Sequence, residues 1–277
     1  VDAPNYAATA LAALQHPRLQ RLQVDVVVGS SSPHIGDLEQ RVRERPNSTL
    51  HVALPSLAGL MARADLALGA AGSTSWERAC LGLPSIVVPM ADNQQQGARA
   101  LEAADVARCV DLTAARDPVG ALAAHVLELL DQPSTLQAMS EACLLLGDGR
   151  GLARVVCAVA GPASGLRLRR TRSTDLWLYH WWANDPLVRQ QSFSRNPIPL
   201  DQHRRWFTRR LTTPLALLRV LEDREGLPLG QIRFERLSED QPRAVVSLSL
   251  DRLARGRGLA VRLLELGLQE LARCWGD

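Results

Sequence analysis

Two short segments of the sequence combine glycine with hydroxyl or basic side chains, as phosphate-binding loops do. The first is Gly72-Ser73-Thr74, which lies between the apolar run DLALGA and the helical pattern SWERACLGL. Free backbone N–H groups and the dipole at a helix start favour an anion, and glycine lets a phosphate approach. We therefore expect Gly72, Ser73 and Thr74 to hold a diphosphate. Glu77, one turn into the helix, could accept hydrogen bonds from a ribose diol.

A simpler interpretation of the same residues stays open. Ser and Thr are common helix caps, so Gly72-Ser73-Thr74 could be only a turn followed by an N-cap. On the helix itself, we expect Trp76 to pack against the protein and Arg78 to be a solvated charge.

The second segment is Arg255-Gly256-Arg257-Gly258-Leu259-Ala260, which follows the strand-like SLSLD and opens a long helical pattern. Backbone N–H groups at a helix start, small residues and arginine charge together suit a pyrophosphate. The alternative is a flexible basic loop.

The elements around the first loop predict an α/β layer. The runs VDVVVG, LHVAL, DLALGA and SIVVP resemble buried parallel strands, and amphipathic stretches of crossover length separate them. The second loop lies in a part with α+β order. There, strand-like LRLRR precedes helical stretches near 175–183 and 200–211, then LALLRVLE, LGQIRFER and AVVSLSLD, and finally the helical pattern at 259–275.

Composition also divides the chain into two parts. The 277 residues are 46% hydrophobic and 22% charged with a net charge of +3, values typical of a soluble globular protein of two domains. Residues 1–160 hold 12 Arg against 16 acidic residues, whereas residues 161–277 hold 20 against 13. The segment GPASG at 161–165 is a plausible linker. We expect domains at 1–160 and 166–277.

The residue inventory excludes several classes of chemistry. All 32 Lys and Arg residues of the sequence are arginine. The sequence therefore has no lysine that could form a Schiff base, bind phosphate in a P-loop or anchor pyridoxal phosphate. The five cysteines show neither a C-x-x-C pair nor zinc spacing, which favours reduced thiols, a cytoplasmic protein and no metal site. No apolar run is long enough for a membrane span, and no nucleic-acid recognition motif is evident. The oligomeric state stays open.

The first part resembles a known family. GSTSWERACLGLPSIVVPMADNQ, with the upstream VVVGSSSPH and the downstream LLLGDGRGLARVV, is similar to the carboxy-terminal, Rossmann-like half of GT-B enzymes. The resemblance is to the UDP-sugar hydrolases of pseudaminic acid biosynthesis and their spore-coat relatives, over about residues 1–160. It implies that Gly72, Ser73 and Thr74 hold the diphosphate and Glu77 the ribose. It further implies that Asn93 and Gln94 bind the sugar or phosphate and that backbone near Val52 to Leu54 pairs with uracil.

One part of that family pattern is missing. Family members carry a glycine-rich segment with a histidine in an amino-terminal half, and none of the histidines of residues 1–160 lies in such a setting: His16, His34, His51 and His125. We therefore expect the chain to be a fragment.

The second part resembles the GCN5-related N-acetyltransferases (GNAT), whose pyrophosphate loop reads R-x-x-G-x-A. The further pattern W-x-N-D-P-x-V-R, S-F, P-I and H-x-x-W-F is similar to the acetyltransferases that act one step before the hydrolase. This resemblance implies acetyl-CoA at residues 255–260. It also implies a nucleotide-sugar acceptor at the following residues, each with a core or cap alternative: Asn184, Arg189, Phe193, His203 and Trp206.

Direct acetyl transfer needs a base for the amine and an acid for the thiolate. Glu235, on a strand-like run, is a candidate base with a surface alternative. In the superfamily a tyrosine after the coenzyme helix often serves as the acid, but Tyr6 and Tyr179 lie elsewhere, so we expect this domain to be incomplete at its C-terminus.

Together the two resemblances imply a bifunctional enzyme of nonulosonic acid synthesis. An acetyl-CoA-dependent N-acetyltransferase for a UDP-amino sugar would be joined to a UDP-2,4-diacetamido-2,4,6-trideoxy-beta-L-altropyranose hydrolase. The alternatives are a GT-B glycosyltransferase fused to a GNAT domain, and a non-catalytic module that binds nucleotide sugar and coenzyme A.

Overall fold

The computed structural model describes residues 2, 4–162, 164–192, 194–236, 238 and 243–276. Contacts divide the chain into two compact units, one that ends at Gly149 and one that begins at Arg150. We describe each unit by itself.

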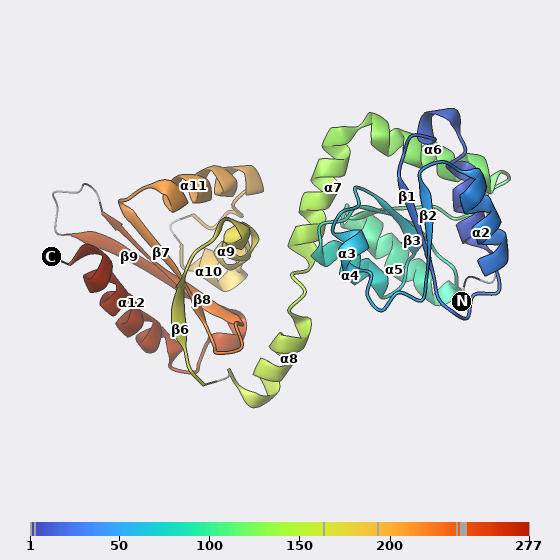
Figure 1. Ribbon diagram of the computed structural model, residues 1–277. Helices are drawn as coiled ribbons and strands as arrows, with labels where there is room; N and C mark the ends of the chain where they lie inside the picture. The colour runs from blue at the N-terminus through green and yellow to red at the C-terminus, as the bar shows by residue number, and fades with distance from the viewer. Residues whose placement is uncertain are drawn as a thin grey trace. The chain divides into compact units, whose positions relative to one another are not determined.

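Unit 1 is built on parallel strands, and the four runs predicted as strands all form them (Figure 1). β1 (Val24–Val28) pairs with β2 (Ser48–Val52), while β4 (Ser85–Val88) lies between β3 (Ala67–Ala70) and β5 (Ala107–Cys109). Every residue of β4 is buried, as a strand covered on both faces requires. The sequence analysis did not predict β5, which has only three residues.

Helices between and after these strands complete the core of unit 1. Leu19 and Ile86 pack with Leu122, Val126 and Met139 in one buried cluster. The helical elements are α1 (Tyr6–Ala13), η1 (Pro17–Leu19), α2 (Ile35–Glu44), α3 (Ala58–Met61), α4 (Thr74–Cys80), α5 (Asp92–Ala103), α6 (Pro118–Asp131) and α7 (Pro133–Leu146). The unit is a Rossmann-like α/β layer, as expected.

Unit 2 has an antiparallel sheet in the order β6 (Arg167–Arg170), β7 (Ala216–Glu222), β8 (Pro228–Arg236) and β9 (Ala244–Leu250). Its helical elements are α8 (Gly151–Ala160), η2 (Ser173–Asp175), α9 (Leu176–Asn184), α10 (Pro186–Gln190), α11 (Leu200–Thr212), η3 (Arg252–Ala254) and α12 (Leu259–Trp275). α12 lies along one face of the sheet, whereas α9 and α11 lie over the other (Figure 1).

Alternation along the strands explains these two layers. Leu221 of β7 and Ile232 of β8 share a buried cluster with Leu263 of α12, while Val220 packs with Tyr179 and other residues of the α9 and α11 layer. Successive strand residues point to opposite faces, so one sheet supports both layers.

Helix α8 packs with unit 2. Cys157 of α8 belongs to the same buried cluster as Leu217 and Leu229 of the sheet. The division between the units therefore precedes α8, ahead of the GPASG segment that the sequence analysis treats as the linker.

Candidate functional sites

The first candidate loop lies where β3 ends and α4 begins. Ser73 occupies the N-cap position of α4 in helical conformation, and its side chain makes no capping hydrogen bond. Ser73 and Glu77 are exposed, while Ser75 and Ala79 on the opposite side of the helix are buried. Ser73 thus stands at the helix start as an exposed residue whose side chain does not cap the helix.

The loop after β4 meets this first loop. Gln94, near the start of α5, accepts a hydrogen bond through Oε1 from Met90 N at 3.0 Å. Its Nε2 would lie 3.9 Å from a Cβ atom built on Gly72. Asn93 is its exposed neighbour in the first turn of α5. The carboxyl ends of the adjacent parallel strands β3 and β4 therefore bring Gly72 and Gln94 together, as Rossmann-like sheets do at their ligand edge.

Two expectations for α4 are wrong. Arg78 is buried, with 5% of its surface exposed, instead of being a solvated charge. Its Nη2 donates to Ala70 O at 2.9 Å and to Ser75 Oγ at 2.8 Å, and burial lowers its pKa. A Cβ on Gly69 would meet Arg78 Nη1 at 2.6 Å, so glycine makes room for the guanidinium. Trp76, expected to pack, is 57% exposed.

The segment expected near a uracil follows β2 directly. Val52 and Leu54 are exposed, and Ala53 between them has φ +53°. Ala53 N donates to Val28 O at 2.9 Å, which holds this left-handed turn against β1. A non-glycine residue in this region is uncommon and strained.

The second candidate loop has two glycines in the left-handed region. Gly256 and Gly258 have φ of +71° and +72°, where a side chain is strained, and an added Cβ would meet open space. Gly258 is the N-cap of the 17-residue helix α12, which has no side-chain cap hydrogen bond. The backbone N–H groups of its first turn therefore have no side-chain acceptor, and a phosphate is a natural partner for them.

The arginines of this loop make contacts within the protein. Arg255 donates through Nε to Leu250 O and through Nη1 to Asp185 Oδ1, both at 3.0 Å. Arg257 Nη2 donates to Cys157 O of α8 at 3.5 Å. Asp251, just before the loop, accepts from Trp182 Nε1 at 3.0 Å. These contacts fix the loop against α8, α9 and α10.

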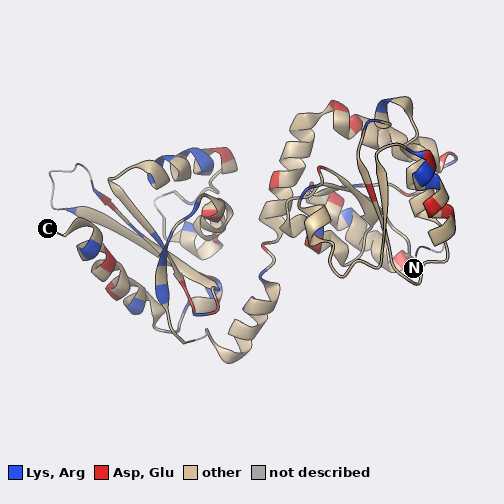
Figure 2. Ribbon diagram, viewed as in Figure 1, with Lys and Arg blue, Asp and Glu red and all other residues tan. Residues whose placement is uncertain are grey.

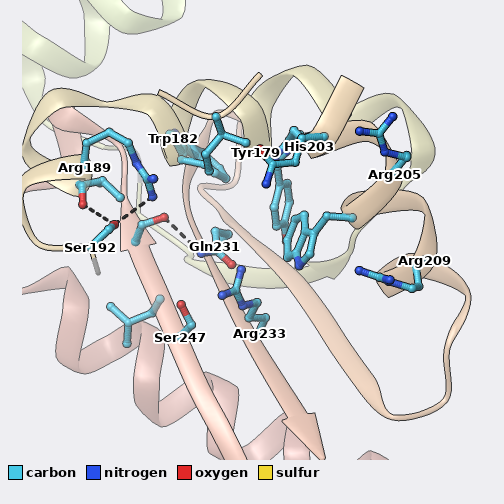
Figure 3. Close-up of a pocket in the computed structure, with 17 residues that line it drawn as sticks. Tyr179, Trp182, Arg189, Ser192, His203, Arg205, Arg209, Gln231, Arg233 and Ser247 are labelled. Carbon is cyan, nitrogen blue, oxygen red and sulfur yellow. Dashed lines mark hydrogen bonds between the residues drawn. The ribbon is translucent and has the colours of Figure 1, made fainter. Parts of the chain in front are cut away.

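A cavity of about 520 Å³ lies between α9 to α11 and the sheet (Figure 3). Arginines form much of its wall, and those on α11 are visible as the basic stretch of that helix in Figure 2. The lining residues are Tyr179, Trp182, Ala183, Val188, Arg189, Ser192, Ile198, Gln202, His203, Arg205, Trp206, Arg209, Gln231, Arg233, Ser247, Leu248 and Ser249. Four of these are arginines, and none is Asp or Glu.

The predicted acceptor residues take different places around this cavity. Asn184 binds the backbone of Ile198, accepting from its N at 2.7 Å and donating to its O at 3.1 Å, and it does not line the cavity. Arg189 does line it, but Nη2 donates to Ser192 Oγ and Nη1 to Ser194 O. Phe193 lies outside the described residues.

His203 and Trp206 of α11 both line the cavity. The two rings lie 5.3 Å apart, and the Arg233 guanidinium lies 5.0 Å from the centre of the Trp206 ring. His203 is 2% exposed, its Nε2 has no hydrogen-bond partner, and burial with the nearby His180 lowers its pKa to about 4. The ring is therefore neutral at physiological pH.

Glu235 does not line the cavity. Its carboxylate pairs with Arg210 at 2.9 Å and with Arg233 at 3.1 Å. Both of its partners are thus guanidinium groups of the protein. Tyr179 is also held within the protein, because its hydroxyl hydrogen-bonds Thr171 Oγ1 at 2.8 Å and donates to Arg219 O at 3.2 Å.

The sequence analysis missed the sheet side of the cavity. Gln231 and Arg233 of β8 lie opposite Ser249 and Ser247 of β9. In the sequence these polar residues alternate with Ile232 and with Leu248, and that alternation is the signal for one polar strand face. Across the described residues we find no cluster of three or more metal-ligating side chains, and no helix there is long and apolar enough to cross a membrane.

Comparisons with known proteins identify both units. Residues 3–150 match the glycosyltransferase family 28 C-terminal domain, and residues 165–273 match the acetyltransferase (GNAT) domain. The spore coat polysaccharide biosynthesis protein SpsG of Bacillus subtilis strain 168 is 32% identical over 101 residues, which cover 36% of this chain and 29% of SpsG. The matched segment thus spans less than a third of that relative.

Solved structures similar to this chain include two forms of a spermidine N-acetyltransferase. A chimera of the Vibrio cholerae enzyme SpeG and hSSAT is 18% identical, with a TM-score of 0.36, and the match covers 41% of this chain and 66% of the other. The Vibrio cholerae enzyme in complex with CoA and spermine is 19% identical, with a TM-score of 0.35, and the match covers 38% and 63%.

The family matches agree with the two folds on either side of Gly149. The chain belongs to the glycosyltransferase family 28 C-terminal domain family through a Rossmann-like unit homologous to part of SpsG, and this unit is fused to a GNAT acetyltransferase domain.

Proposed function

We propose that this chain is part of a bifunctional enzyme of nonulosonic acid synthesis of the pseudaminic acid type. Unit 2 transfers the acetyl group of acetyl-CoA to the free amine of a UDP-linked amino-deoxy sugar. Unit 1 binds the UDP-sugar for release of UDP by hydrolysis, with the catalytic groups for that step supplied by a further segment.

One observation carries the proposal for unit 2. The glycine loop before α12 is joined to the helix beside the 520 Å³ cavity, because Arg255 of the loop pairs with Asp185 at the start of α10. Asp185 also accepts from Leu187 N at 3.0 Å and Val188 N at 3.3 Å, and Val188 lines the cavity. A diphosphate on the loop and an acceptor in the cavity would thus bind to neighbouring parts of one framework.

In the proposed transfer, the amine nitrogen attacks the thioester carbonyl carbon. A C–N bond forms, the C–S bond breaks, the nitrogen loses one proton and the departing sulfur gains one. Residues 255–260 hold the coenzyme diphosphate with backbone N–H groups, and the contacts of Arg255 and Arg257 keep that loop in place. The walls of the cavity hold the sugar nucleotide, whose phosphates suit the arginines of α11.

The proposal for unit 1 rests on its family and on the two loops that meet at the strand ends. Gly72, Ser73 and Thr74 would receive the diphosphate, with Gln94 beside them and Asn93 on the same turn. Glu77 is exposed on α4 and free to accept from ribose hydroxyls. The left-handed turn at Ala53 would present backbone from Val52 to Leu54 to the uracil edge.

The test is a product analysis of the full-length protein incubated with a UDP-amino sugar and acetyl-CoA. Mass spectrometry is expected to show the N-acetylated sugar and free UDP. Absence of both would overturn the proposal. If UDP and acetyl-CoA stabilise the protein but no product forms, the chain is a non-catalytic binding module instead. If UDP is released while the sugar passes to an acceptor other than water, unit 1 belongs to a glycosyltransferase and not to a hydrolase.

A further inference from the structure

One end of the unit 2 cavity adjoins the glycine loop before α12. Trp182 and Val188 both line the cavity. Trp182 Nε1 donates to Asp251 at 3.0 Å, and Val188 N donates to Asp185 at 3.3 Å. Asp185 in turn accepts from Arg255 Nη1 of the loop at 3.0 Å. A coenzyme on that loop would therefore present its acetyl group to the cavity from this end.

Two arginines of α11, Arg205 and Arg209, lie at the other end of the cavity. Figure 3 shows them on the opposite side from Trp182 and Arg189. Residues four apart on a helix share one face, and both of these arginines line the cavity. The lining face of α11 runs from Gln202 to Arg209, which is about 10 Å along the helix axis. A ligand that fills the cavity thus extends from the loop side toward these two arginines.

The wall of the cavity carries positive charge that the protein does not neutralise. Arg205 pairs with Asp201 at 2.8 Å, so these two charges cancel. Glu235 pairs with both Arg210 and Arg233, so one carboxylate serves two guanidinium groups and one positive charge remains. No Asp or Glu lines the cavity itself. A cleft of this kind attracts an anion and repels a cation.

Arg209 differs from the other arginines that line the cavity. Arg189 donates to Ser192 Oγ, while Arg205 and Arg233 are paired with carboxylates. The side chain of Arg209 makes no hydrogen bond or ion pair within the part of the chain that the structure describes. It is also exposed, so a ligand can reach it. Its N–H groups are therefore available to phosphate oxygens, which a guanidinium group binds in a bidentate manner.

We propose that Arg209 binds a phosphate group of the acceptor and makes the acetyltransferase unit specific for a sugar nucleotide over a free amino sugar. This assignment deepens the proposed function and rests on it. It also orients the acceptor, because a phosphate at Arg209 leaves the sugar amine toward Trp182 and Val188, where the coenzyme loop adjoins the cavity. Arg209 selects the substrate and takes no part in making or breaking bonds.

The experiment measures steady-state acetylation by the full-length protein at saturating acetyl-CoA with two acceptors. One acceptor is a UDP-linked amino-deoxy sugar, and the other is the same amino sugar without the nucleotide. Acetyl transfer is followed as release of coenzyme A, so that hydrolysis in unit 1 does not alter the reading. The variants are Arg209→Gln, which removes the charge, and Arg209→Glu, which reverses it.

Arg209→Gln is expected to raise the KM for the UDP-linked sugar about 30-fold and to leave kcat unchanged, because the phosphate contact is the same in the ground state and the transition state. Arg209→Glu is expected to raise this KM further by repulsion. For the free amino sugar, kcat/KM should stay at the wild-type value in both variants. The matched control is Arg204→Gln, on the same helix but outside the cavity lining, which should behave as wild type.

Three results would overturn the phosphate subsite: an Arg209→Gln variant with the KM of the control, an equal loss of kcat/KM for both acceptors, and a wild type without preference for the UDP-linked sugar. Each of these results includes acetylation of the amino sugar, so the acetyltransferase activity stands. A wild type that acetylates neither acceptor overturns the proposed function and the subsite with it.

Discussion

The two units present their candidate sites in opposite ways. In unit 1, Ser73, Glu77 and Asn93 are exposed on loops at strand ends, and the buried charged residue nearby, Arg78, is bound to backbone and Ser75. In unit 2, His203 and Gln231 are buried and each keeps one unpaired atom. Burial alone therefore does not mark function. Arg78 Nε, like His203 Nε2 and Gln231 Oε1, has no hydrogen-bond partner. The two regions differ in that His203 and Gln231 line a cavity and Arg78 does not.

The largest expected effect concerns the acid stability of unit 2. The pKa of folded His203 is about 4, because burial and His180 disfavour the charged ring, whereas an unfolded histidine has a pKa near 6.5. Above pH 6.5 neither state binds the proton. As the pH falls from about 6.5 to 4, only the unfolded state does, so stability falls by up to about 3 kcal/mol.

Urea unfolding followed by tryptophan fluorescence at several pH values measures this loss. Five of the six tryptophans belong to the second unit, so the signal reports mainly on it. His203→Asn is expected to flatten the decline between pH 6.5 and 4. Hydrogen bonds from arginines lower the pKa values of Asp185 and Glu270 against the effect of burial. The variant keeps both carboxylates, so their contribution to the decline is the same in the two proteins. An unchanged slope in the variant would contradict a neutral buried His203.

The second effect tests whether backbone at the start of α12 binds the coenzyme. Gly258→Asp places a carboxylate where the diphosphate is expected, and acetyl-CoA affinity should fall about 100-fold, or about 2.7 kcal/mol. Isothermal titration calorimetry measures it. Gly226→Asp is the matched control, since Gly226 also has a positive φ of +81° with open space around it. Equal affinities in both variants would show that the loop does not bind acetyl-CoA.

The smallest effect concerns the exposed loop of unit 1. Asp is as good a helix cap as Ser, so Ser73→Asp should leave thermal stability nearly unchanged. Its charge should nonetheless lower UDP affinity about tenfold, or about 1.4 kcal/mol, by repelling the diphosphate. Ser134→Asp, an exposed serine in the first turn of α7, places the same charge at another helix start. Equal UDP binding by the two variants would remove Ser73 from the site.

The sequence predicted what depends on local pattern. Apolar runs marked β1 to β4, and the segment from 255 to 260 marked a glycine-rich loop before the helix α12. It could not predict which polar residues share the cavity, because Gln231 meets Ser249 only through the register of β8 and β9. Nor could it show that Asn184 holds Ile198, since that contact depends on the path of the connection before α11.

The position of Arg78 was misjudged for a related reason. Arginine is usually exposed, and only the backbone of β3 with glycine at position 69 gives the guanidinium a place inside. A charged residue in a helical pattern carries no local sign of that space.

The contacts of Asp185 and Asp251 connect the loop before α12 to the helices that wall the cavity of unit 2. Asp185 joins Arg255 to the first turn of α10, and Asp251 joins the start of the loop to Trp182 of α9. A ligand that displaced Arg255 from Asp185 would change the surroundings of Val188, which binds the same carboxylate oxygen and lines the cavity. Thermodynamic linkage would make this influence reciprocal. If bound acetyl-CoA changed the affinity for the sugar nucleotide by some factor, bound sugar nucleotide would change the affinity for acetyl-CoA by the same factor.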